Sequence, residues 1–298
     1  MPLPRLAWPG EVVGQVSRAG AEQTGIPAGT PVLTGTIDAW AEAFSVGVRR
    51  PGDLMVMYGS TMFLVRVLDA PLSHRKLWAT AGVEPGTRCL AAGMATSGSL
   101  TTWLRELAGG PPFEELLSGA AATPPGADGL LVLPYFAGER SPLFDADARG
   151  VVAGLTLSHS RDHLARAVYE ATAFGVRHNV EAMREAGAPP GRAVAVGGGT
   201  QGGFWTQVVS DVSGLEQELP EQTIGASYGD ALLAAIAAGL VAPDTDWTAH
   251  SSTVRPQAQH RELYDELFEL YVDLYDATAA TAHRLAALQR AAHAAATA

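Results

Sequence analysis

Short runs of β-branched and other apolar residues alternate along this chain with longer segments of helical periodicity. The runs lie at 31–36, 53–58, 62–67, 89–94, 130–135, 193–196 and 215–219. Alternation of this kind is typical of an α/β fold with a mixed or parallel sheet flanked by helices. Two of the runs, 53–58 and 62–67, are joined only by Gly59, Ser60 and Thr61, which predicts a β-hairpin.

Composition and charge exclude several classes of protein. The 298 residues carry a formal net charge of −11 and no basic tract, so nucleic acid is not an expected partner. Cys89 is the only cysteine, which rules out an internal disulfide and a thiolate metal site and favours a reducing, cytoplasmic setting. The longest small-apolar stretch, 231–242, is shorter than the ~20 residues of a membrane span, so we expect no membrane insertion.

Helices can be placed from their ends and their apolar faces. Ser160 is a good N-cap for a helix over 162–185, and Gly187 ends it. Near the start of the chain, a helix over 39–48 stops at the Arg49–Gly52 break, where we place a domain boundary. The last helix is expected to bury a stripe made of Leu263, Leu267, Leu270, Leu274 and Tyr275.

Three glycine-rich turns follow apolar runs, at 58–61, 95–99 and 196–203. Glycine allows positive φ angles and close backbone approach, and exposed amides at such turns bind anions. Three such turns in one chain therefore indicate a ligand that carries phosphate. The alternative is that each is only a tight turn.

The third turn also fits the G-x-G-x-x-G pattern of dinucleotide-binding proteins. It runs from Gly197 to Gly202, with Glu216 and Glu218 about twenty residues further on. A dinucleotide-dependent oxidoreductase is thus an alternative function. Its fold, however, normally opens with this unit, and the hairpin at Gly59 has no place in it.

Two further patterns have simpler explanations. Residues 225–229 fit the G-x-S-x-G of hydrolases, but they follow only a weak strand, so we expect Ser227 to cap a helix. His159 and His163 have the i, i+4 spacing of a zinc site but lack the glutamate that metalloproteases place after the first histidine. We therefore expect a solvated or capping pair of histidines, and no metal site.

Asp38 follows an apolar run and precedes a helix, the position in which α/β enzymes carry catalytic groups. A carboxylate there can accept the proton of a substrate hydroxyl whose oxygen attacks phosphorus. From spacing alone, Asp38 could equally be the N-cap of the helix that begins near Trp40.

Four longer motifs point to one family. Residues 150–155 and 163–170 together fit its second signature, 134–142 is similar to its GERTP segment, 147–150 to its ARG segment, and 197–211 to its nucleotide-side GGG and W-x-Q motif. On these motifs the chain resembles the carboxyl-terminal part of an FGGY carbohydrate kinase, a relative of xylulokinase, ribulokinase and glycerol kinase. The resemblance extends from about Pro9 to Leu285.

This resemblance implies two actin-like ATPase domains, of the ribonuclease H-like fold, with the active site in the cleft between them. Residues 1–50 would be the last strand and helix of the first domain, and residues 51–298 the whole second domain. Asp38 falls on the catalytic aspartate, the general base. The implied nucleotide-binding residues lie on or beside the glycine turns: Gly59, Ser60 and Thr61 at the β- and γ-phosphates, Gly98 and Thr102 near the nucleotide, and Gly198, Gly199 and Gly202 under its α-phosphate and adenosine.

The implied reaction is the ATP-dependent phosphorylation of a sugar or polyol, with Mg²⁺ held mostly by nucleotide phosphates and water. The family's D-x-G-T-[ST] phosphate loop does not occur in this sequence, so we expect weak or no kinase activity from the chain alone. A complementing amino-terminal domain or a homo-oligomer is the expected partner. The sequence Ile37-Asp38-Ala39 is closer to ribulokinase-like members than to the other members, but it does not name the sugar. The alternative is a non-catalytic nucleotide-binding or interaction module that keeps the fold.

Overall fold

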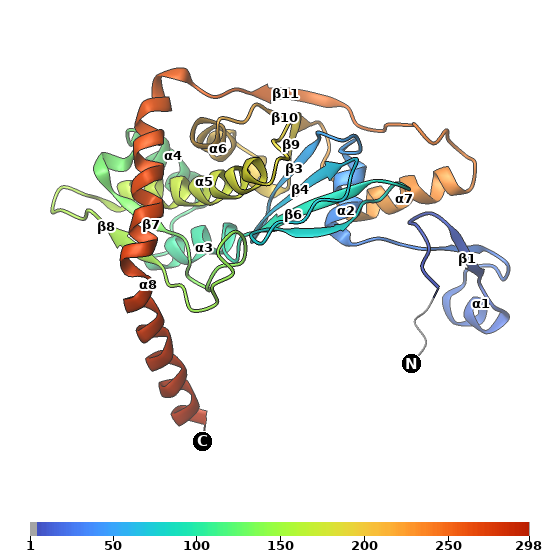
Figure 1. Ribbon diagram of the computed structural model, residues 1–298, viewed down its shortest axis with the longest axis horizontal. Coiled ribbons are helices and arrows are strands. Elements are labelled where there is room, and N and C mark those ends of the chain that lie inside the picture. Colours follow the sequence, from blue (N-terminus) through green and yellow to red (C-terminus); the bar gives the residue numbers. More distant parts are fainter. Residues whose placement is uncertain (1–4, 298) are drawn as a thin grey trace.

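A mixed seven-stranded sheet forms the centre of the computed structural model, which describes residues 5–297 (Figure 1). In spatial order its strands are β11 (His250–Val254), β10 (Gln217–Pro220), β9 (Ala193–Val196), β3 (Leu54–Tyr58), β4 (Met62–Leu68), β6 (Arg88–Gly93) and β5 (Trp78–Ala81). The neighbours β10, β9 and β3 are parallel, and every other neighbouring pair is antiparallel. The mixed sheet of an α/β fold is therefore confirmed.

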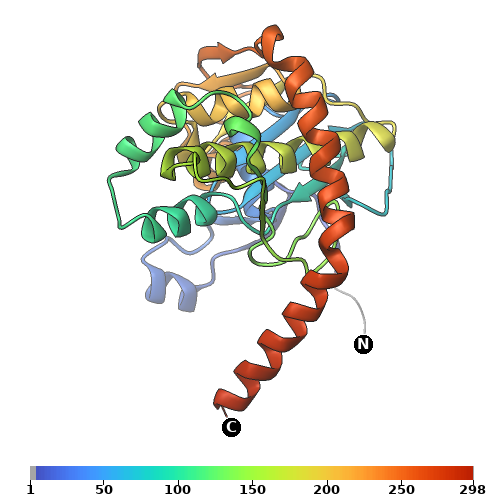
Figure 2. The ribbon, with the colours of Figure 1, turned by 90° about the vertical axis from the view of Figure 1, so that its left-hand side faces the viewer.

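Helices cover both faces of this sheet. On one face lie α3 (Gly98–Leu107), α5 (Arg161–Glu185) and α6 (Phe204–Ser213), with α4 (Phe113–Ala122) packed on α5 and the long α8 (Arg261–Thr297) outside them. The other face is covered by α2 (Asp38–Ser45), on which α7 (Ala226–Ala237) packs. The end of α8 extends beyond the body of the protein (Figure 2). Among the described helices, none is both long enough and apolar enough to cross a bilayer.

Two small sheets complete the fold. Strands β7 (Leu131–Leu133) and β8 (Val151–Ala153) pair antiparallel, as do β1 (Val12–Gln15) and β2 (Pro31–Leu33), which flank α1 (Arg18–Thr24). Because α2 packs directly on the large sheet, the first fifty residues contribute to its covering. The division at residue 50 stays a prediction.

The predicted hairpin is confirmed. β3 pairs with β4 over the whole length of β3, with Tyr58 opposite Met62 and Leu54 opposite Arg66. Alternate residues of β3 point to opposite faces, so that Leu54 and Tyr58 join the core under α5 while Met55 joins the core under α2. Both faces of the strand are buried, which explains its nearly continuous apolar sequence.

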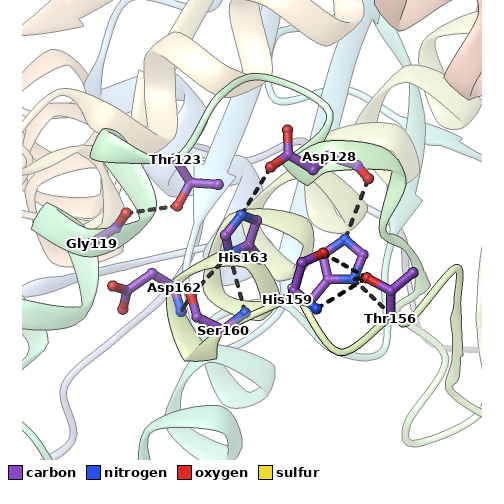
Figure 3. Close-up of polar contacts among 9 residues, drawn as sticks. Gly119, Thr123, Asp128, Thr156, His159, Ser160, Asp162 and His163 are labelled. Carbon is purple, nitrogen blue, oxygen red and sulfur yellow. Dashed lines mark hydrogen bonds and ion pairs between the residues drawn. The ribbon is translucent and has the colours of Figure 1, made fainter.

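His163 is part of the capping structure of α5, and His159 lies just before that helix (Figure 3). The Ser160 hydroxyl accepts the Asp162 amide at 3.2 Å, and His163 Nδ1 accepts the Ser160 amide at 3.2 Å, which makes a capping box. His163 Nε2 lies 3.1 Å from the Asp128 carboxylate, and His159 Nδ1 accepts the amide of residue 156 at 2.9 Å. Of the predicted pair, the capping role is confirmed for His163 alone. In the part of the chain that the structure describes, no group of three or more acidic, histidine or cysteine side chains is arranged for a metal ion.

One prediction about helices was wrong, and another is confirmed only in part. The N-cap of α7 is Gly225, and Ser227 lies inside the helix, where no side chain caps its start. On α8 the expected stripe is buried only in part: Leu267 is buried and Leu274 and Tyr275 pack against the core, whereas Leu263 and Leu270 are 37% and 49% exposed. Tyr264 and Tyr271 are buried as well, and their hydroxyl groups find partners on Glu170 and on Tyr135.

Packing between α2 and α7 gives a first testable prediction. A methyl group on Gly229 would lie 1.9 Å from the carbonyl oxygen of Ala41. The substitution Gly229→Ala must therefore push the two helices apart, and we expect it to lower the free energy of unfolding by about 2–4 kcal/mol, measured by urea denaturation.

The matched control is Gly20→Ala, because Gly20 is also in a helix but its new methyl group would make only ordinary contacts, at 3.4 Å or more. Here alanine should be neutral or stabilising by up to about 1 kcal/mol. Equal effects of the two substitutions would contradict the close helix packing.

Candidate functional site

The three glycine turns predicted from the sequence meet at one end of the large sheet. β6 is antiparallel to β4, which is antiparallel to β3, so β3, β6 and β9 all run in the same direction. Their carboxyl ends lead into residues 59–61, 94–97 and 197–203 respectively. In open α/β sheets, ligands bind beyond this end of the strands.

The hairpin turn rests on the N-terminus of α3. The amides of Ser97 and Ser99 donate to the Ser60 carbonyl at 3.1 and 3.0 Å, and the Gly98 amide donates to the Gly59 carbonyl at 3.0 Å. A methyl group on Gly98 would lie 2.7 Å from that same Gly59 oxygen, so only glycine allows this approach. The first amides of α3 therefore bind the protein's own turn.

This support leaves two amides pointing outward. The only cis peptide bond among the described residues is Ser141–Pro142, so the peptides that follow Gly59 and Ser60 are trans. In a trans peptide, the C=O and N–H groups point in opposite directions. Because the carbonyls of Gly59 and Ser60 point at α3, the amides of Ser60 and Thr61 point away from it. Within residues 5–297 neither amide has a protein acceptor, so the turn offers two adjacent donors, as an anion site does.

The loop after β9 is pressed against the end of β3. A methyl group on Gly197, whose φ is +93°, would lie 2.6 Å from the Tyr58 carbonyl oxygen, and one on Gly199 would lie 2.7 Å from the Trp205 ring. Tyr58 is itself held rigidly, because its hydroxyl donates to Gln217 at 2.6 Å and its ring packs edge-on against Trp205. These two glycines are therefore required for packing.

Gly198 and Gly202 have open surroundings. A methyl group on either would meet no atom within 4 Å, and Gly202 has a φ of +80°. α6 begins next to them without a side-chain cap, and an uncapped helix N-terminus beside glycines suits an anion. Thr102 is exposed one turn into α3, with its hydroxyl donating to the Gly98 carbonyl at 3.0 Å. Contact of these residues with a nucleotide stays a prediction.

Asp38 lies at the same end of the sheet. It is the first residue of α2, whose N-cap is Ile37, so the N-cap alternative for Asp38 was wrong. Its side chain is exposed, and Trp40 packs against Phe63, the second residue of the strand that leaves the hairpin turn. One turn further on, burial and the Asp38 charge raise the pKa of Glu42. The catalytic role of Asp38 stays a prediction.

The acids required by the dinucleotide alternative are occupied elsewhere. Glu218 stands beside Val194 in the first half of β10 and accepts the Arg192 guanidinium at 2.7 Å. Glu216 pairs with Arg255 at 3.2 Å. Neither acid lies at the carboxyl end of β10, where a ribose would be bound.

A cavity of about 440 Å³ lies at the opposite end of the sheet, beside the start of β3. Three arginines and five acids line it, and several of them form ion pairs: Arg49 pairs with Glu84, and Arg192 pairs with Glu218 and lies 3.8 Å from Asp53. We interpret these ion pairs as contacts that hold the end of α2 to the sheet.

Glu139 is a residue whose place near the turns the sequence analysis did not recognise. Its side chain is only 5% exposed, and Oε1 accepts the amides of Ala95 at 2.6 Å and Arg140 at 2.7 Å. Burial raises the pKa of its carboxyl to about 7, even though the two amides and the Arg140 charge act in the other direction. Tyr135 and Tyr271 are the other titratable groups near it.

Comparison with known proteins identifies relatives of the whole chain. Residues 54–238 match the FGGY family of carbohydrate kinases, C-terminal domain. The xylulose kinase of Bacillus subtilis is 29% identical over 275 residues, covering 90% of this chain and 55% of that protein. The ribulokinase of Bacillus licheniformis is 31% identical over 290 residues, covering 89% of this chain and 52% of that protein.

Solved structures of carbohydrate kinases have the same fold as this chain. The crystal structure of xylulose kinase from Rhodospirillum rubrum, 32% identical, superposes with a TM-score of 0.85 over 94% of this chain and 58% of that one. The fold is thus the actin-like ATPase fold that the resemblance implied. The chain spans about half the length of the curated relatives that it matches.

Glu139 should make the stability of the protein depend on pH. Its pKa is about 7 in the folded protein, against an ordinary 4.5, so the folded state holds this proton more tightly. The free energy of unfolding should therefore fall as pH rises from 4.5 to 7, by about 3 kcal/mol from this group. Glu139→Gln removes the titration, so the stability of this variant relative to the parent should rise by that amount between pH 4.5 and 8 in urea denaturation.

The control is Glu22→Gln, which changes an exposed acid on α1. Its stability relative to the parent should stay the same across the pH range. A difference between Glu139→Gln and the parent that does not change with pH would show that Glu139 titrates normally.

Proposed function

Because the chain belongs to the FGGY family of carbohydrate kinases, we propose that it forms the nucleotide side of an enzyme that transfers the γ-phosphate of ATP to a hydroxyl of a sugar or polyol. The observation that carries this proposal is the pair of outward amides at Ser60 and Thr61, which suit phosphate oxygens. The two curated relatives described above are named for xylulose and ribulose, so these sugars are the first acceptors to test.

Asp38 is proposed as the general base. Its carboxylate would accept the proton of the acceptor hydroxyl while that oxygen forms a bond to the γ-phosphorus, and the bond from the γ-phosphorus to ADP breaks. Its exposure, and its place at the end of the sheet that carries the turn, support this role.

The glycine turns are proposed to bind the nucleotide. Ser60 and Thr61 would donate to the β- and γ-phosphates, where fixed amide dipoles stabilise the charge that develops during transfer. The open face at Gly198 and Gly202, beside the uncapped start of α6, would receive the α-phosphate and adenosine. Mg²⁺ would be held by the phosphates and water and would neutralise charge on the transferred group.

The working enzyme also needs the opposite wall of the cleft. We propose that residues 1–50 end a first domain, that 51–298 form the second, and that an amino-terminal domain, in the same polypeptide or another, supplies that wall. The greater length of the relatives supports this. Since loss of positioned groups costs many orders of magnitude in rate, the chain alone should turn over slowly or not at all.

The test is calorimetric titration of the purified chain, together with an assay of phosphate transfer to ketoses and polyols after an amino-terminal domain of the family is added. We expect the chain to bind ATP·Mg²⁺ and not NAD. Asp38→Asn should keep ATP binding within threefold and lower sugar-dependent turnover by about 10²–10⁴-fold. Glu266→Gln, which changes an exposed acid on α8, is the control and should keep both.

Each other outcome would contradict one part of the proposal. NAD binding would favour an oxidoreductase, and failure to bind any nucleotide would remove the proposed function. ATP binding with no turnover under any condition would favour a non-catalytic module. Full turnover by Asp38→Asn would place the general base elsewhere.

A further inference from the structure

We propose that Glu139 is a positioning residue, which sets the hairpin turn of Ser60 and Thr61 for phosphate through the segment that leads into α3. The proposal rests on the proposed function and adds a residue that touches neither nucleotide nor sugar. It is carried by hydrogen bonds at both ends of one short backbone segment, residues 95–99, which bind a buried carboxylate at one end and the turn at the other.

The first step is the contact between Glu139 and residue 95. Ala95 lies between the end of β6 and the start of α3, and its amide donates to Oε1 of Glu139 at 2.6 Å. The same oxygen accepts the Arg140 amide at 2.7 Å. A single buried acceptor thus joins two segments that lie 44 residues apart in the sequence.

Further bonds make this junction rigid. The Arg140 guanidinium donates to the Met94 carbonyl at 2.6 Å, and the Ser141 hydroxyl accepts the Gly93 amide at 2.6 Å. The Thr96 hydroxyl also donates to the Pro134 carbonyl. Residues 93–96 are therefore held along their length by residues 134–141, with Glu139 in the middle.

The last step leads from this segment to the turn. Ser97 follows directly, and the amides of Ser97, Gly98 and Ser99 hold the carbonyls of Ser60 and Gly59 at 3.0–3.1 Å. Those carbonyls fix the direction of the two outward amides, as argued above. We therefore expect a shift at Ala95 to be passed to the turn through residues 97–99, which lie two to four positions further along the chain.

The choice of variants separates positioning from general stability. Glu139→Ala removes the acceptor, whereas Glu139→Gln keeps an oxygen in the same place. Glu170→Gln is the matched control, because Glu170 is also a buried acid that accepts a backbone amide, that of Gly126 at 2.9 Å, but it makes no bond to residues 93–99. Each variant is titrated with ATP·Mg²⁺ and with AMP, and hydrogen exchange is measured at residues 97–99.

We expect Glu139→Ala to bind ATP·Mg²⁺ at least tenfold more weakly while its affinity for AMP changes less than twofold, because only ATP reaches the turn. Glu139→Gln should stay within threefold of the parent for both ligands. Exchange at residues 97–99 should be at least tenfold faster in Glu139→Ala and unchanged in the two glutamine variants.

Three results would overturn the proposal: unchanged ATP affinity in Glu139→Ala, an equal loss for ATP and AMP, or failure of glutamine to restore binding. If the parent chain binds no ATP at all, the proposed function fails. The exchange measurement then still decides whether Glu139 holds the start of α3, and unchanged exchange in Glu139→Ala would refute it.

Discussion

The carbonyl groups of Gly59 and Ser60 accept three backbone amides from the start of α3, and the whole candidate site depends on this contact. The first amides of any helix have no partner within the helix, and the carbonyls of a tight turn likewise lie outside the strand ladder. Here the first amides of α3 and the carbonyls of the turn are each other's hydrogen-bond partners. Since the peptide unit is planar, fixing those carbonyls also fixes the direction of the amides behind them.

Local patterns in the sequence were enough for individual elements. Two apolar runs with three residues between them predicted the β3–β4 hairpin, and Ser160 predicted the start of α5. The glycine residues also predicted each of the three turns. Their meeting at one end of the sheet was implied only by family resemblance, because it depends on β6 running parallel to β3 from two strands away. No local pattern encodes such a strand order.

Two of the misses depend on tertiary contacts, and the third on where a helix begins. On α8, partners on distant elements satisfy the hydroxyl groups of the buried Tyr264 and Tyr271, whereas Leu263 and Leu270 stay partly exposed. Ser227 has the right residue type for a cap, but the chain turns into α7 two residues earlier. Glu139 looks like a surface residue by type, and only its two backbone donors explain its burial.

A turn that offers backbone amides makes unusual demands on its sequence. Every residue except proline carries the same N–H group, so the side chains of Ser60 and Thr61 are free to vary without removing the donors. The strict requirements fall instead on residues that touch no ligand, such as Gly98, where a single methyl group would collide with Gly59. Over evolutionary time, substitutions should therefore be tolerated at Ser60 and Thr61 and removed by selection at Gly98. The residues that resist substitution most are then not those nearest the bound phosphate.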